Sequence, residues 1–140
     1  MASPKAPESR RGIFLTLMTI LFAVLAISDF TKALQYSNNH HMGLVVLGYK
    51  FVGVGANIVG GGLFGLYLLA YAIGIWRMRS WVLPLAIVYA LYVPVNLVMF
   101  WFLHTDPRPS IGFIAFYLVL SVGGSVGTAL YLAYNRDRLT

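Results

Sequence analysis

A few polar side chains lie inside long apolar stretches of the sequence, and these residues could bind a ligand or hold helices together. Asn57 lies six residues after Phe51, and Asn96 lies six residues before Phe102. If the two stretches form antiparallel helices that cross a membrane, both asparagines lie about 9 Å below the same surface, at about 1.5 Å of rise per residue. We therefore expect Asn57 and Asn96 to meet.

Two interpretations of this polar level remain open. The asparagines can hydrogen-bond to each other and hold neighbouring helices together, with a free energy of about 0.6 to 2 kcal/mol in a membrane. Alternatively, they line an outward-open cavity for a lipid headgroup or a small solute, in which helical spacing adds other polar residues. The candidates for this pocket are Asn57, Asn96, Tyr92 and Tyr117 at depth, with Asp29 and Lys50 at the mouth. Tyr89 shares a helical face with Tyr92 and Asn96, as Ser121 does with Tyr117.

Ionisable groups are absent from three of the apolar stretches. Residues 51–76, 81–102 and 110–134 contain no Asp, Glu, Lys, Arg or His. Proton relays, ion-coupled transporters and voltage sensors depend on such groups inside the membrane. Hydrolases and transferases need a carboxylate or a histidine as general base. We therefore expect a protein that is not an enzyme and uses no cofactor.

The remaining titratable residues offer little further chemistry. Asp29 and Lys32 are three residues apart, so that one helical face can carry both and allow an ion pair. His40, His41 and His104 all fall on the same predicted side of the membrane, but adjacent histidines in a polar loop are usually solvated, and no metal site is expected. The sequence contains no cysteine, which excludes disulfides and thiol catalysis.

Small residues recur at helical spacing in two of the stretches. Gly61 with Gly65, and Gly123 with Gly127, form GxxxG pairs, and Gly53 belongs to the first series. Glycines at this spacing let helix backbones approach closely. They can pack the helices of one chain together. Alternatively, one glycine face, foremost that of residues 51–76, binds a second copy or a larger membrane complex.

The elements that position these residues must form in lipid. Hydrophobic residues make up 59% of the 140 residues and charged residues only 10%, against about 25% charged residues in ordinary globular domains. Four stretches reach the roughly 20 residues needed to cross about 30 Å of hydrocarbon: residues 13–32, 51–76, 81–102 and 110–134. Because lipid cannot satisfy backbone polar groups, each stretch should be a helix. The predicted fold class is an all-α integral membrane protein, a four-transmembrane-helix antiparallel bundle over residues 13–134.

The basic residues predict an orientation. Seven of the ten Lys and Arg residues lie in the N-terminal segment, the short loop near residue 78 and the tail. The positive-inside rule then places both termini in the cytoplasm. Residues 1–12 are expected to be a disordered basic segment and residues 135–140 a short cytoplasmic tail. The net charge of +6 thus needs no nucleic-acid partner.

Two other segments allow alternatives. Residues 10–27 resemble a signal peptide in their charge and apolar run, but the helical pattern continues to Leu34, which favours a retained span. The longest connection, residues 33–50, contains polar loop formers followed by the apolar run Gly43 to Leu47. This run is expected to lie on the membrane surface or to extend the second helix.

The loop residues Trp76, Arg77, Arg79 and Trp81 resemble the cytoplasmic hairpin of many small bacterial four-span proteins, which implies architecture only. We expect a location in the cytoplasmic (inner) membrane of a prokaryote. The sequence favours a small, non-enzymatic assembly or accessory subunit that acts through its small-residue helix faces. The alternative is a lipid or small-solute carrier or pore that uses the polar pocket. The expected partners are membrane lipid and a second copy or a larger membrane complex.

Overall fold

The computed structural model describes residues 11–103 and 110–140, and it is mostly helical. The long helices are α1 (Gly12–Phe30), α3 (Val54–Trp76) and α4 (Val82–Leu103), followed by α5 (Ile111–Tyr117), a π-helical segment (Leu118–Val122) and α6 (Gly123–Tyr134), which are continuous. The prediction of four helices long and apolar enough to cross a membrane is confirmed. Residues 1–10 of the predicted N-terminal segment, and His104, lie outside the described residues.

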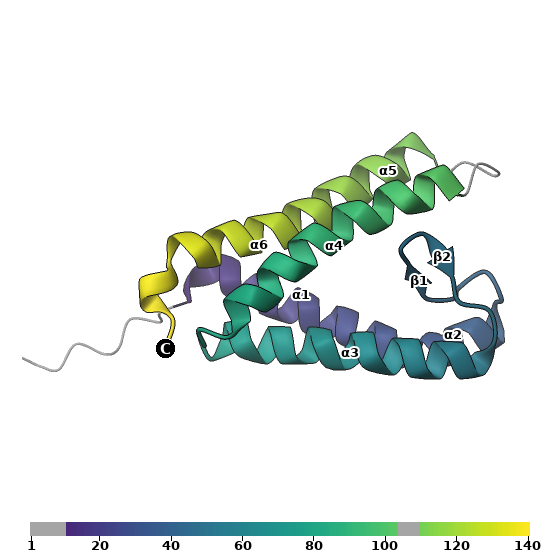
Figure 1. Cartoon of the computed structure of the whole chain (residues 1–140), viewed down its shortest axis with the longest axis horizontal. Helices are drawn as coiled ribbons and strands as arrows, with labels where there is room; N and C mark the ends of the chain where they lie inside the picture. The colour runs from purple at the N-terminus through teal and green to yellow at the C-terminus, as the bar shows by residue number, and fades with distance from the viewer. Residues whose placement is uncertain (1–10, 104–109) are drawn as a thin grey trace, which may run out of the picture.

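The long helices are arranged as two antiparallel pairs (Figure 1). In the first pair α1 packs along α3, and in the second pair α4 packs along α6 and the π-helical segment. The pairs meet where α1 and α4 begin and α3 and α6 end, which we call the closed end. Towards the other end of the helices, the open end, the two pairs diverge.

The hydrophobic core lies towards the closed end. Leu15, Ile75, Val82 and Leu132, one from each long helix, are completely buried there. The hydroxyl of Thr128, also completely buried, is satisfied by a hydrogen bond that it donates to the Gly124 carbonyl at 2.6 Å. The outward surfaces of the four helices carry exposed leucine, isoleucine and valine side chains, which is the pattern expected of helices whose surroundings are lipid.

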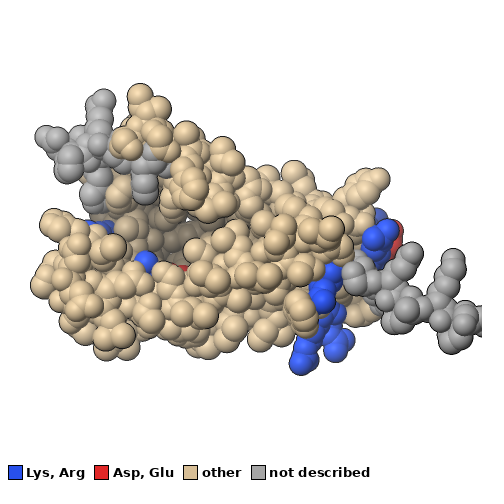
Figure 2. Space-filling view, turned by 180° about the vertical axis from the view of Figure 1, so that it is seen from behind, with Lys and Arg blue, Asp and Glu red and all other residues tan. Residues whose placement is uncertain are grey.

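The closed end contains Arg11, where the described part of the chain begins, the C-terminal residues and most of the described basic residues. The Arg11 guanidinium lies 3.4 Å from the Trp76 ring centroid and donates to the Trp76 carbonyl at 2.8 Å. The tail folds back onto the loop after α3, where the Thr140 amide donates to the Met78 carbonyl at 2.8 Å. Figure 2 shows the basic residues of this end together; they are Arg11, Arg77, Arg79, Arg136 and Arg138.

The connection between α1 and α3 differs from its prediction. It contains helix α2 (Lys32–Asn38) and an antiparallel hairpin of β1 (Val45–Val46) and β2 (Tyr49–Lys50). The hairpin turns at Leu47 and Gly48, whose φ angles of 48° and 78° suit a two-residue turn with both φ values positive. The apolar run thus does not extend the helix. It folds back between the diverging pairs (Figure 1), because its backbone finds hydrogen-bond partners there.

Two predicted helix boundaries also shift. Helix α3 begins at Val54 and not at residue 51, because Gly53 has a φ of 100° that no helix allows. Gly53 was predicted to belong to the glycine face of this helix, but it lies just before the first helical residue. A Cβ at Gly53 would meet nothing within 4 Å. Helix α1 ends at Phe30, and Thr31 separates it from α2.

Candidate binding cavity between the helix pairs

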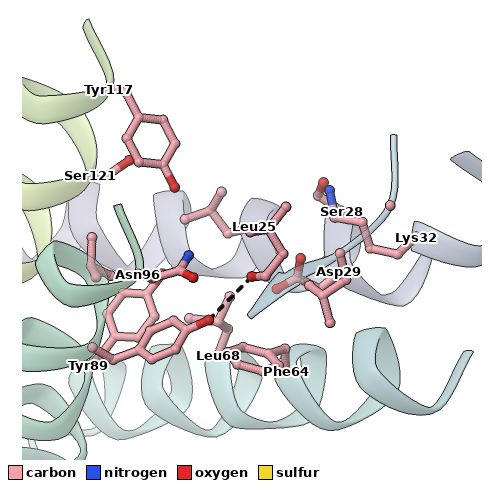
Figure 3. A pocket seen from close by; sticks show the side chains of 15 residues that line it. Leu25, Ser28, Asp29, Lys32, Phe64, Leu68, Tyr89, Asn96, Tyr117 and Ser121 are labelled. Atoms are coloured by element: carbon pink, nitrogen blue, oxygen red, sulfur yellow. Dashed lines mark hydrogen bonds between the residues drawn. The ribbon is translucent and has the colours of Figure 1, made fainter. Parts of the chain in front are cut away.

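A cavity of about 310 Å³ lies between the two helix pairs on the side of the open end. Its walls come from every long helix and from the hairpin segment, as Figure 3 shows for the labelled residues. The lining residues are Leu25, Ser28, Asp29, Lys32, Gly43, Leu44, Val45, Phe64, Leu68, Tyr89, Tyr92, Val93, Asn96, Tyr117 and Ser121. Figure 2 shows the hollow from behind, with an acidic side chain visible in it.

Polar side chains are concentrated in this cavity, whereas the surrounding helices are apolar. The Asp29 carboxylate points into it from α1, and the Tyr117 side chain points into it from α5 on the opposite side (Figure 3). Tyr92 and Asn96 line it from α4. Four of the six predicted pocket residues, Asp29, Tyr92, Asn96 and Tyr117, are therefore brought together by the fold.

Asp29 does not form the predicted ion pair with Lys32. The Lys32 ammonium donates to Gln35 Oε1 at 3.2 Å, and Gln35 Nε2 in turn donates to the Ser28 carbonyl at 3.0 Å. Lys32 begins α2 beyond the break at Thr31, so the two residues do not share one continuous helix. Within residues 11–103 and 110–140, the structure shows no hydrogen bond or ion pair to the Asp29 carboxylate.

An aromatic cluster closes the cavity towards the closed end. Tyr89 lines the cavity, and its ring lies 5.7 Å from that of Phe22 and 5.9 Å from that of Tyr71, between centroids. The rings of Phe22 and Tyr71 stack at 4.5 Å and are buried below it. The cavity therefore has a packed aromatic floor at the middle of the helices, and the core lies beneath this floor.

The hairpin forms another wall, and two asparagines hold it. Asn57, only 1% exposed, accepts a hydrogen bond from the Leu44 amide at 2.7 Å and donates to the carbonyls of Phe51 and Gly53. Asn96 accepts one from the Gly48 amide at 3.0 Å. The prediction that the asparagines meet is thus replaced by a different arrangement, in which the hairpin lies between them and each binds its backbone.

Two predicted pocket residues do not line the cavity. Asn57 is enclosed by the backbone it binds, and Lys50 lies in β2, half-buried, with its side chain near Gly43. Conversely, the sequence did not assign Phe64, Ser28 or Lys32 to the pocket. Their positions depend on how α1 and α3 pack, and no local pattern marks them.

The predicted glycine pairs lie in different surroundings. A Cβ at Gly61 would collide with the Asp29 carbonyl, and one at Gly65 would lie 2.9 Å from the Phe30 ring. These two glycines therefore let α1 approach α3 within the chain, beside the cavity wall that carries Asp29. A Cβ at Gly127 would be 3.7 Å from Phe14, an ordinary contact, and one at Gly123 would meet nothing within 4 Å.

A second, apolar cavity adjoins the first. It has a volume of about 240 Å³, lies between α3 and α4, and shares Phe64, Tyr89 and Tyr92 with the main cavity.

Within the described ranges, no group of three or more His, Asp or Glu residues could hold a metal ion. Comparison with protein families, curated proteins and solved structures finds no match for this chain.

Proposed function

We propose that this chain is a multi-pass membrane protein that binds a lipid headgroup or a small solute in the cavity between its helix pairs. The observation that carries the proposal is the Asp29 carboxylate, which points into the cavity without an ion-pair partner among the described residues. A charged group at this level of a membrane is costly unless it has a role or a partner. Hydroxyl and amide groups from α4 and α5 provide convergent polar contacts, as in typical ligand sites.

A binding or carrier role fits the shape of the cavity better than an open pore. The aromatic floor of Phe22, Tyr71 and Tyr89 separates the cavity from the closed end. Below it, Leu15, Ile75 and other residues are completely buried, so the cavity does not continue to the closed end in this conformation. A carrier would need the two helix pairs to move relative to each other. No catalytic group is required by this role, in keeping with the expectation of a non-enzymatic protein.

The assembly role has weaker support, because α1 covers the glycine face of α3 that was predicted to bind a second chain. Gly61 and Gly65 of α3 face the backbone of Asp29 and the ring of Phe30, and are not available to a second chain. Gly123 keeps an open position on the outer surface of the second pair. An oligomer or a larger complex formed through that surface is compatible with ligand binding in the cavity.

We further propose that the helix pairs form an antiparallel transmembrane bundle with both termini in the cytoplasm of a prokaryotic cell. The support is the clustering of Arg11, Arg77, Arg79 and the two arginines of the tail at the closed end. In the described part of the chain, the only basic residues towards the open end are Lys32 and Lys50. In this orientation the cavity opens on the outer side of the inner membrane.

A cavity-filling variant tests the binding role. Ser121 lines the cavity from the π-helical segment, whereas Val119 of the same segment is 76% exposed and faces outward. The wild type, Ser121→Phe and Val119→Phe are purified in native lipid and compared by native mass spectrometry and thermal unfolding. We expect a tightly bound small molecule or lipid in the wild type and Val119→Phe, and its loss from a folded Ser121→Phe. Equal occupancy of all three proteins would overturn the proposal.

A further inference from the structure

The main cavity combines one carboxylate with several aromatic rings. Asp29 points in from α1, and Phe64, Tyr89 and Tyr92 line the walls formed by α3 and α4. The centroids of Phe64 and Tyr92 are 5.4 Å apart, and those of Tyr89 and Tyr92 are 6.4 Å apart. The three rings therefore form a nearly continuous aromatic wall beside the carboxylate.

These two features select the same charge. A carboxylate away from bulk water is stabilised most by a cation, because Coulomb attraction strengthens as the dielectric constant falls. The π-face of a tyrosine or phenylalanine ring also attracts cations, and organic ammonium groups are often recognised by aromatic residues in this way. An anionic ligand would be repelled by Asp29, and a neutral apolar ligand would leave the carboxylate without a partner.

Lys32 weakens this preference but does not form an ion pair with Asp29. It lines the cavity and attracts the Asp29 carboxylate electrostatically, but its ammonium donates to Gln35 Oε1 at 3.2 Å. It can therefore attract an anionic group that lies next to a bound cation, such as the phosphate of a zwitterionic headgroup, without occupying the position beside Asp29.

We infer, on the basis of the proposed function, that the ligand carries an ammonium group, which binds between Asp29 and the aromatic wall of Phe64, Tyr89 and Tyr92. The cavity volume of about 310 Å³ is at the lower end for ligand sites, and it suits a small amine or one lipid headgroup. The adjoining apolar cavity of about 240 Å³ would receive the hydrocarbon part of an amphipathic ligand. The ammonium group is common to free amines and to the ethanolamine and choline headgroups of lipids.

The test uses choline and its uncharged isostere 3,3-dimethyl-1-butanol, which differ in charge but little in shape. Binding of each to the detergent-purified protein is measured by calorimetric titration. We expect choline to bind at least ten-fold more tightly than the neutral alcohol. Asp29→Asn should remove this difference and Asp29→Glu should keep it. Asp137→Asn, which changes the other described acidic residue at the far end of the molecule, is the matched control and should bind as the wild type does.

A second arm identifies the source of the ammonium group. Nanodiscs containing equal amounts of phosphatidylethanolamine, phosphatidylcholine and phosphatidylglycerol are used to load the protein, and the retained lipids are measured by native mass spectrometry. Asp29-dependent retention of the first two lipids, without choline binding, supports a headgroup as the ligand. Choline binding without lipid selection supports a free amine.

The outcomes separate this inference from the proposed function. If a ligand is lost from Ser121→Phe but the alcohol binds as tightly as choline, or if phosphatidylglycerol is retained preferentially, the ammonium inference is wrong and the binding role stands. If Asp29→Asn is folded and leaves selectivity for choline and ammonium lipids unchanged, the assignment of Asp29 is wrong. If no solute or lipid depends on the cavity, both proposals fail.

Discussion

The two asparagines that hold the hairpin should contribute unequally to stability. Replacement of Asn57 by leucine removes the acceptor of the buried Leu44 amide and the donor to the Phe51 carbonyl. The Gly53 carbonyl keeps a partner, since the backbone amide of residue 57 also donates to it at 3.3 Å. Two polar groups thus lose their partner, and an unsatisfied buried group costs about 1–3 kcal/mol. We expect Asn57→Leu to lower the free energy of unfolding by about 2–4 kcal/mol.

Replacement of Asn96 by leucine should cost less. It leaves one group without a partner, the Gly48 amide, and we expect a loss of about 1–2 kcal/mol. Because both asparagines bind the same hairpin, its release by one replacement removes part of what the other contributes. The double variant should therefore lose at least about 0.5 kcal/mol less than the sum of the single losses.

The assay is reversible unfolding in mixed micelles by titration with dodecyl sulfate, monitored by the fluorescence of the three tryptophans. Asn38→Leu is the matched control, because Asn38 is exposed at the end of α2, and its replacement should change the free energy by less than about 0.5 kcal/mol. The reasoning is refuted if Asn57→Leu is as stable as this control, or if Asn96→Leu is the more destabilised of the two. Strict additivity in the double variant would show that the hairpin does not couple the helix pairs.

Three further predictions concern packing and orientation. Gly61→Ala should destabilise the protein by about 1–3 kcal/mol, because its Cβ would collide with the α1 backbone, whereas Gly62→Ala has open space and should be neutral or slightly stabilising; equal unfolding curves would contradict this. Tyr71→Phe should not destabilise the protein, and can stabilise it by up to about 1 kcal/mol, since the completely buried Tyr71 hydroxyl has no partner among the described residues; a large loss in the same assay would reveal a hidden partner. In the naturally cysteine-free chain, an impermeant thiol reagent should label His40→Cys but not Arg79→Cys on intact cells, and labelling of both from one side would exclude the proposed topology.

The candidate site was predictable where one helix carries its residues. The spacing of Tyr89, Tyr92 and Asn96 places them on one face of α4, and the structure finds all three in the cavity wall. The spacing of Tyr117 and Ser121 predicts their shared face in the same way, and both line the cavity. Helical periodicity is a local property and applies along α4. Ser121 lies in the π-helical segment that follows α5, and it still lines the cavity together with Tyr117.

The site was not predictable where the chain leaves a helix. The equal depth of Asn57 and Asn96 suggested a direct hydrogen bond, but a hairpin lies between them. The short distance from Asp29 to Lys32 along the chain suggested an ion pair, but the helix ends between the two residues. The first error arose because the hairpin enters between two regular helices, and the second because a helix was assumed to continue through a break.

Hydropathy along the chain determined that four helices can cross a membrane. The positions of the Lys and Arg residues between these helices determined that most basic residues collect at one end. Both follow from sums over neighbouring residues, because transfer into lipid depends on the composition of each segment. Only the tertiary structure decided that the helix pairs diverge, that the hairpin enters between them and that Asp29 faces an aromatic wall. The bonds that hold the hairpin join residues 13 and 48 positions apart, and such pairings depend on the packing of whole helices.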